Sequence, residues 1–205
     1  MNSGTALSCQ FIEGLLLGGG IVLLIWAALH DLAARTVPNG LPVAVALAGF
    51  GLRALDHSLM AGLAAAGASF AILFALWSAR AIGGGDVKLW SASVLLIPAH
   101  WQAELDCLTR ILLVGGALGL LYLLLRPALM RWCARARSSA PRANIPRANI
   151  PGANIPGAGL FSRILRAEAW RIARKAPLPY ALAIAGGTIL TLLPSFPPSA
   201  LVALR

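Results

Sequence analysis

The sequence predicts an all-α membrane protein that crosses the bilayer about six times. Its 205 residues are 59% hydrophobic, with a mean hydropathy of +0.78, which is too apolar for an ordinary soluble domain. The apolar residues also gather into long stretches, and a transmembrane helix needs about 20 such residues. Six stretches are expected to span: 11–30, 41–55, 59–79, 89–101, 109–125 and 178–194.

The first stretch is preceded by no basic residue, since Arg35 is the first one in the chain. A secretory signal peptide begins with a basic region, so we expect 11–30 to be retained as a transmembrane helix. Its Gly18-Gly19-Gly20 run allows a neighbouring helix to approach closely, as do the many Ala and Gly residues of the second and third stretches. The fourth stretch is short, and three glycines precede it, at 83–85. Its lower end is expected either at 89 or within the Gly83–Asp86 turn.

A basic segment, 126–177, separates the fifth stretch from the sixth. It contains a pentapeptide repeat (141–159) with a Pro at every fifth residue, which excludes a regular helix and favours a low-complexity linker. Residues 160–175 fit either a basic amphipathic helix on the inner leaflet or a solvated linker helix. The expected organisation is therefore one domain: five helices in 1–125, this loop, and a sixth helix with a tail in 178–205.

The net charge of +10 is a topology signal. If the loop after the first helix is cytoplasmic, all 17 Lys and Arg residues except Arg53, Arg110 and Arg205 lie inside. Such an excess of inside charge is the pattern of inner-membrane proteins. It predicts a periplasmic N-terminus and contact with anionic lipid, and we expect no nucleic-acid partner.

The three cysteines, Cys9, Cys107 and Cys133, contain no Cys-x-x-Cys pair, so we expect no metal site or redox pair. Cys9 and Cys107 would both lie on the outer side, where a disulfide is permitted. Isolated small apolar residues are the preferred interpretation.

Two aspartates are the candidate catalytic residues. Asp31 follows the first apolar stretch, and Asp86 precedes the fourth, so both are expected at the cytoplasmic face. Ionisable groups close to the membrane are costly and are functional candidates by default. Two carboxylates that share one proton are the chemistry of an aspartic protease, because the ionised group activates a water while the protonated group polarises the carbonyl. This chemistry needs no cofactor.

Residues beside the aspartates have both functional and plain interpretations. Gly83 and Gly85 would let a substrate backbone approach. Arg35 and Lys88 would bind lipid phosphate, favour an ionised carboxylate or simply mark the inner boundary. Asp86 alone would also serve as a helix N-cap.

The motifs resemble the type IV prepilin peptidases, the GxGD class of membrane aspartic proteases. The resemblance is carried by Asp31-x-x-x-Arg35-x-Val37-Pro38-Asn39, by Gly83-x-Gly85-Asp86-Val87-Lys88 and by Pro179-Tyr180, although Leu182 replaces the second Pro usual in the last element. It implies that Asp31 and Asp86 are the catalytic pair. The substrates implied are pilin-like precursors with a basic leader and an apolar helix, cut at the cytoplasmic face of the inner membrane.

Some members of this family carry a region with paired cysteines that is linked to N-methylation. Residues 1–30 contain no such region, so this chain resembles the short, peptidase-only form, and no methyltransferase activity is predicted. Two other classes of function stay open: a non-catalytic membrane scaffold, and a small proton-coupled transporter. Transporter carboxylates lie near the bilayer midplane, whereas both aspartates here are expected at one face.

Overall fold

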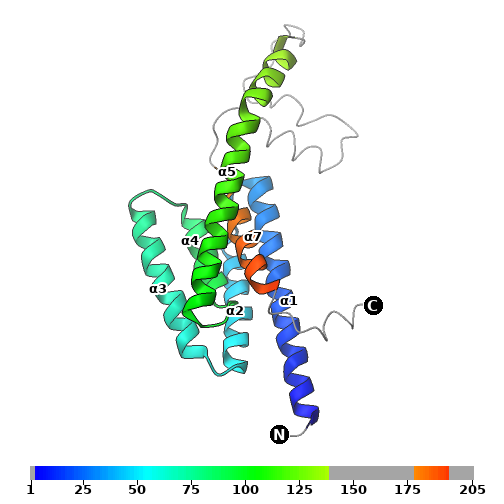
Figure 1. The fold of residues 1–205 in the computed structure, drawn as a ribbon, viewed down its shortest axis with the longest axis vertical. Coiled ribbons are helices and arrows are strands. Elements are labelled where there is room, and N and C mark those ends of the chain that lie inside the picture. The colour runs from blue at the N-terminus through cyan, green and yellow to red at the C-terminus, as the bar shows by residue number, and fades with distance from the viewer. Residues whose placement is uncertain (1–2, 139–177, 194–205) are drawn as a thin grey trace. The chain divides into compact units, whose positions relative to one another are not determined.

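The computed structural model describes residues 3–138 and 178–193. These residues form six α-helices and contain no strand (Figure 1). The helices are α1 (Ser3–Ala34), α2 (Gly40–Leu55), α3 (Leu59–Ser78), α4 (Gly84–Val94), α5 (Trp101–Ser138) and α7 (Tyr180–Leu192). The predicted all-α class is confirmed. The repeat at 141–159 and the segment 160–175 lie outside the described residues.

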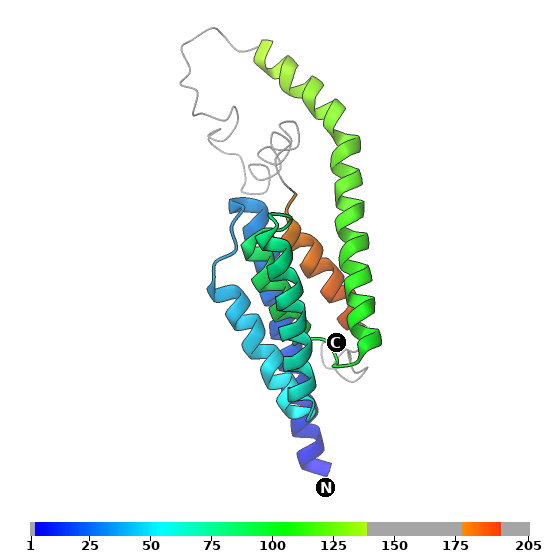
Figure 2. The same cartoon turned by 90° about the vertical axis from the view of Figure 1, so that its left-hand side faces the viewer.

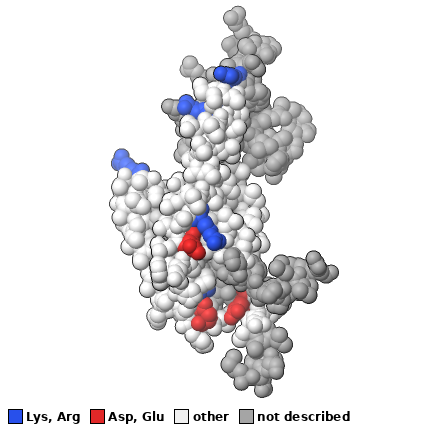
Figure 3. All heavy atoms as spheres, in the orientation of Figure 1, with Lys and Arg blue, Asp and Glu red and all other residues white. Residues whose placement is uncertain are grey.

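Three of the described helices are long and apolar enough to cross a membrane, over Ser8–Ala34, Leu59–Ser78 and Trp101–Arg131. The helices α2 and α7 are apolar but shorter. Large hydrophobic side chains are exposed along all five of these helices, and the face in Figure 3 shows few charged side chains. An apolar exterior of this kind is expected of a membrane protein, because lipid replaces water around it.

The bounds 89–101 predicted for the fourth stretch are wrong, although the alternative start within the Gly83–Asp86 turn agrees with the helix. Helix α4 begins at Gly84 and ends after 11 residues at Val94. At 1.5 Å per residue it is about 16 Å long, roughly half of the hydrocarbon thickness. The chain then turns before α5, as expected near Pro98, because proline disfavours helix in the residue that precedes it.

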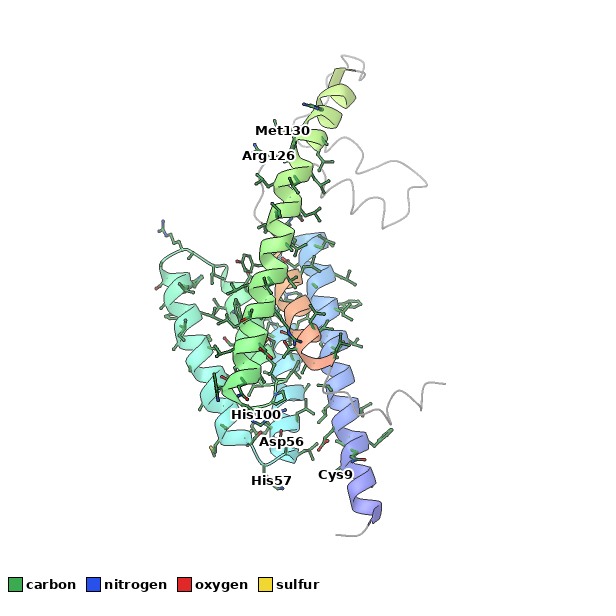
Figure 4. The ribbon with its side chains drawn as sticks, in the orientation of Figure 1. Cys9, Asp56, His57, His100, Arg126 and Met130 are labelled. Carbon is green, nitrogen blue, oxygen red and sulfur yellow. The ribbon has the colours of Figure 1, made fainter. Side chains whose placement is uncertain are left out.

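The chain divides into two compact units. The first comprises residues 1–115 and 179–205, and the second comprises 116–178, with α5 passing from one to the other. The part of the second unit that is described is mainly helical, and Arg126 and Met130 on α5 are labelled in Figure 4. Residues 126–138, predicted as the start of the loop, continue α5 because Ala, Leu, Met and Arg are strong helix formers.

The core of the first unit is built around α4 and α7. Helix α4 packs against α2, α3 and α7, while α1 packs against α2 and α7 (Figure 2). The short α4 is buried almost completely from Val87 to Val94. A helix surrounded by other helices is expected to be buried on every face, so α4 serves as the centre of the bundle.

Glycines allow the closest helix contacts in this core. A Cβ atom at Gly49 of α2 would lie 2.5 Å from Cβ of Leu95, and one at Gly187 of α7 would lie 2.5 Å from the backbone nitrogen of Ile111. Of the Gly18-Gly19-Gly20 run, only Gly20 meets a neighbour, the side chain of Leu96. Close approach through small residues is the expected packing of membrane helices.

The cysteines that the structure describes are not joined. Cys9 is exposed and Cys107 is buried, and both are free thiols. The sulfur of Cys107 lies 3.8 Å from Oγ1 of Thr188 across the contact between α5 and α7. Cys107 is therefore a buried packing residue, as the preferred interpretation of the sequence had it.

Candidate active site

The first site aspartate lies in the last turn of α1. Asp31 is only 8% exposed, and its carbonyl accepts a hydrogen bond from the backbone N–H of Arg35 at 2.7 Å. Arg35 has a positive φ of 58°, a left-handed conformation that commonly ends helices. The helix thus includes Asp31 and ends just beyond it, so the carboxylate is held by regular backbone rather than by the loop.

The loop after Asp31 is fixed by His30. Its Nδ1 lies 2.6 Å from the carbonyl oxygen of Thr36. Because a carbonyl only accepts, Nδ1 carries the hydrogen and donates it. This bond ties the end of α1 to the chain that leads to Pro38 and Asn39. This role could not be predicted from the sequence, since a histidine beside an aspartate carries no signal that it binds a loop carbonyl.

The second site aspartate lies in the first turn of α4. Gly83 is the N-cap residue, so Asp86 is the third residue inside the helix and is not the N-cap that the plain interpretation assumed. Its carboxylate accepts a hydrogen bond from the backbone of Gly83. An acid at this position reaches back to the N-cap N–H and is favoured by the helix dipole. The N-terminus of α4 therefore fixes the orientation of Asp86.

The glycines before Asp86 are close to other parts of the site. A Cβ atom at Gly83 would lie 2.9 Å from Oδ2 of Asp86, and one at Gly84 would lie 3.2 Å from the indole nitrogen of Trp77. At Gly85 the nearest atom would be Cβ of Val37, at 3.8 Å. Gly83 thus leaves space for the carboxylate, and Gly85 lies against the loop that follows α1.

A direct hydrogen bond joins the two motifs. Nζ of Lys88 donates to Oδ1 of Asn39 over 3.0 Å, across 49 residues of sequence. Asn39 is the N-cap residue of α2, yet its side chain makes no capping bond, although Asn is among the best N-caps. The side chain is used instead to hold Lys88. This contact, together with that of Gly85 and Val37, brings the motif at 31–39 and the motif at 83–88 into one site.

The two carboxylates are close enough to interact electrostatically. Burial, and next the negative charge of Asp31, raise the pKa of Asp86 from 3.8 to about 6, while the Gly83 hydrogen bond lowers it. Asp86 lies outside the long apolar helices. A carboxyl group beside a second carboxylate keeps its proton to higher pH, because like charges in a confined site repel. The site can therefore hold one protonated and one ionised aspartate up to about pH 6.

The third predicted element lies in the same unit. Pro179 is fully buried as the N-cap residue of α7. Tyr180 is 36% exposed and lines a cavity with Ile82 and Trp90, two residues that flank Asp86 in the sequence. The structure therefore places Tyr180 beside the segment that carries Asp86, whereas Pro38 is exposed at the start of α2.

The fold and this geometry define a class: a helical membrane protein with two interacting aspartates at the helix ends of one bundle. Residues 19–129 match the type IV leader peptidase family. The chain belongs to that family, which makes it a membrane peptidase. The match includes both aspartates and the residues around them but not Pro179 or Tyr180. Comparison with curated proteins and with solved structures gave no match.

Proposed function

We propose that this protein is an aspartic endopeptidase that removes the short basic leader from type IV pilin-like precursors, including Flp-type ones. The observation that carries the proposal is that Asp31 interacts with Asp86: burial, and next the charge of Asp31, raise the pKa of Asp86 to about 6. A carboxylate with only a packing role is not expected to have a second acid beside it, because like charges repel. Titratable groups whose pKa is raised by a specific neighbour cluster at functional sites.

The chemistry follows from the unequal protonation of the pair. Asp86 holds the proton and donates a hydrogen bond to the carbonyl oxygen of the scissile peptide. Ionised Asp31 accepts a proton from a water, whose oxygen forms a bond to the carbonyl carbon. The C–N bond then breaks, and the leaving amine takes up a proton from the carboxyl pair. One water is consumed, and the pair returns to its single shared proton.

The charge distribution supports a cytoplasmic site in the inner membrane. Three basic residues of the first unit lie at the end that holds the aspartates. Arg35 follows α1, Arg80 follows α3, and Lys88 lies in the first turns of α4. Four acids, Glu13, Asp56, Glu104 and Asp106, belong to the other end. Basic residues accumulate on the cytoplasmic side of membrane proteins. A leader that is itself basic would be cut at this side before its precursor is exported.

The proposed specificity is for cleavage alone, without methylation of the new N-terminus. The remaining residues of the site have supporting roles in this scheme. Gly83 leaves room for the Asp86 carboxylate, and Gly85 keeps the backbone open to a substrate. Lys88 and Asn39 hold the two motifs together, while Arg35 ends α1 just after Asp31.

The test is cleavage of a co-expressed pilin-like precursor, read as a mobility shift on a gel. Wild type is expected to cut, and Asp31→Asn and Asp86→Asn are each expected to lose activity by a thousandfold or more, on the order seen when one member of a catalytic unit is removed. Asp56→Asn is the matched control, because Asp56 lies in the turn after α2, at the other end of the unit.

The proposal fails if both site variants cut as wild type does, since the pair would then not be catalytic. It also fails if the folded wild type cuts none of several precursors, a result that would move the scaffold or transporter interpretation ahead. Loss of activity in Asp56→Asn at unchanged protein level would show that the assay responds to any lost carboxylate.

A further inference from the structure

The first unit contains an apolar groove between α3, α4 and α5, with a volume of about 500 Å³. Leu76 of α3, Trp90 of α4 and Leu112 of α5 line its sides and floor. Ile82, just before α4, and Tyr180, at the start of α7, line one end of the groove. Trp101 and Glu104, at the start of α5, also line it. Almost every lining residue is hydrophobic, so the groove suits an apolar occupant.

The groove lies on the same face of α4 as Asp86. With 3.6 residues in each turn, Trp90 and Val94 are rotated by about 40° and 80° from Asp86 around the helix axis. Both residues line the groove. Tyr180 lines it as well, at the start of α7. Asp86 itself does not line the groove, but it lies one turn before Trp90 on the side of α4 that faces it.

A second apolar hollow, of about 450 Å³, lies between α2, α3 and α4 and includes Lys88 and Ser91. These residues are rotated by about 140° or more from Asp86 around α4. This hollow therefore opens on the opposite face of the helix. Of the two hollows, the one between α3, α4 and α5 is the one aligned with Asp86.

We infer that the groove between α3, α4 and α5 binds the apolar helix of the precursor, with the scissile bond at the Ile82 and Tyr180 end. The inference rests on the proposed function, in which an apolar helix directly follows the cut. From Trp101 to Leu112 the lining extends along about 17 Å of helix. That length accepts about three turns of a second helix, which would bind through the stripe i, i+3, i+4 and i+7.

Two neighbouring leucines of α5 provide a matched test. Leu112 lines the groove and is 56% exposed, whereas Leu113 does not line it and is 66% exposed. Leu112→Trp would fill the groove, and Leu113→Trp would add the same bulk on another face of the helix. Two substrates are compared for each variant: the full precursor, and a short peptide that spans the cut but lacks the apolar helix.

Leu112→Trp is expected to cut the full precursor at least about tenfold more slowly at low substrate concentration, with the short peptide cut within twofold of wild type. Leu113→Trp is expected to cut both substrates within twofold of wild type. Equal rates for the two variants on the precursor would overturn the inference. A loss on both substrates in Leu112→Trp would also overturn it, because the defect would then lie at the carboxylates.

A crosslinking experiment provides a second readout that requires no turnover. A photoreactive residue at 112 or 113, in the Asp86→Asn background, is exposed to the precursor in vesicles. Position 112 is expected to crosslink to the apolar helix of the precursor, and position 113 only weakly. Capture of lipid alone, or of a second copy of the chain, would overturn the inference. A wild type that cuts neither substrate would instead contradict the proposed function, so the two failures are distinguishable.

Discussion

The two ends of the first unit each hold a carboxylate, but in opposite electrostatic surroundings. At the end where α2 leads into α3, Asp56 forms an ion pair with Arg53 at 2.6 Å and accepts hydrogen bonds from the backbone and hydroxyl of Ser58. Figure 4 labels Asp56 and His57 in this turn. At the other end, the charge that acts on Asp86 is that of a second acid, Asp31.

This difference distinguishes a carboxylate in an ion pair from the carboxylate that we propose to be catalytic. Arg53 is buried, and Asp56, which remains 39% exposed, offsets part of the cost of burying that charge and fixes the turn. Asp86 is held beside a like charge, which opposes ionisation and costs stability. Functional sites commonly retain such unfavourable arrangements because the chemistry needs them. The two ends therefore predict opposite responses to matched substitutions.

The largest expected effect comes from substituting two glycines, one beside the Asp86 carboxylate and one beside the Arg53 side chain. A Cβ at Gly83 would lie 2.9 Å from the Asp86 carboxylate, and one at Gly62 would lie 2.7 Å from Cγ of Arg53. Gly83→Ala is expected to reduce cleavage by about 10- to 100-fold with little change in Tm, because displacing a catalytic group by about 1 Å has that effect. Cleavage rate and Tm are measured on the same detergent-solubilised preparation.

Gly62→Ala is expected to do the reverse. Crowding of the buried Arg53 should lower the free energy of unfolding by about 1–2 kcal/mol, while cleavage per folded molecule stays close to wild type. If both alanine variants lose activity to the same degree, the division into a structural end and a functional end is wrong.

The next largest effect is a change in the free energy of unfolding, which is expected to have opposite signs for substitutions at the two ends. Asp86→Asn removes a buried charge and its repulsion with Asp31, and it is expected to raise the free energy of unfolding at pH 8 by about 1–2 kcal/mol. Asp56→Asn leaves the buried Arg53 without its counter-charge and is expected to lower it by a similar amount. Thermal unfolding at pH 8 tests both. A fall in Tm for both variants would contradict the assigned repulsion.

The smallest effect is the pH dependence. The pKa of Asp86 is raised from 3.8 to about 6, so the folded protein binds more protons than the unfolded chain between these values. Stability therefore decreases as pH rises from about 4 to about 6 and then levels off. Cleavage should also decline above pH 6, as the pair loses its shared proton.

The measurement is the Tm difference between wild type and Asp86→Asn at pH 4.5, 6 and 8. Titration of the acids outside this pair is common to both proteins and cancels in this difference. The variant should gain most over wild type at pH 8 and least at pH 4.5. A difference that does not change with pH would show that Asp86 keeps an ordinary pKa.

Much of this protein was determined by local sequence. The apolar stretches predicted the bounds of α2 and α3 to within one residue at each end, because long apolar runs and the turn at Pro38-Asn39-Gly40 are local signals. The two aspartates and their glycines were also visible, since each lies within a short motif. The family resemblance that they carry agrees with the match over residues 19–129.

The tertiary structure decided what no local pattern contains. The motif around Asp31 and that around Asp86 meet through Lys88 and Asn39, 49 residues apart, and the repulsion that raises the pKa of Asp86 exists only once they meet. The stretch 89–101 was expected to cross the bilayer, whereas α4 has only 11 residues and is buried among other helices. Burial in protein and burial in lipid favour the same apolar residues. Hydropathy reports which segments avoid water, whereas packing decides which of them cover others and which face the bilayer.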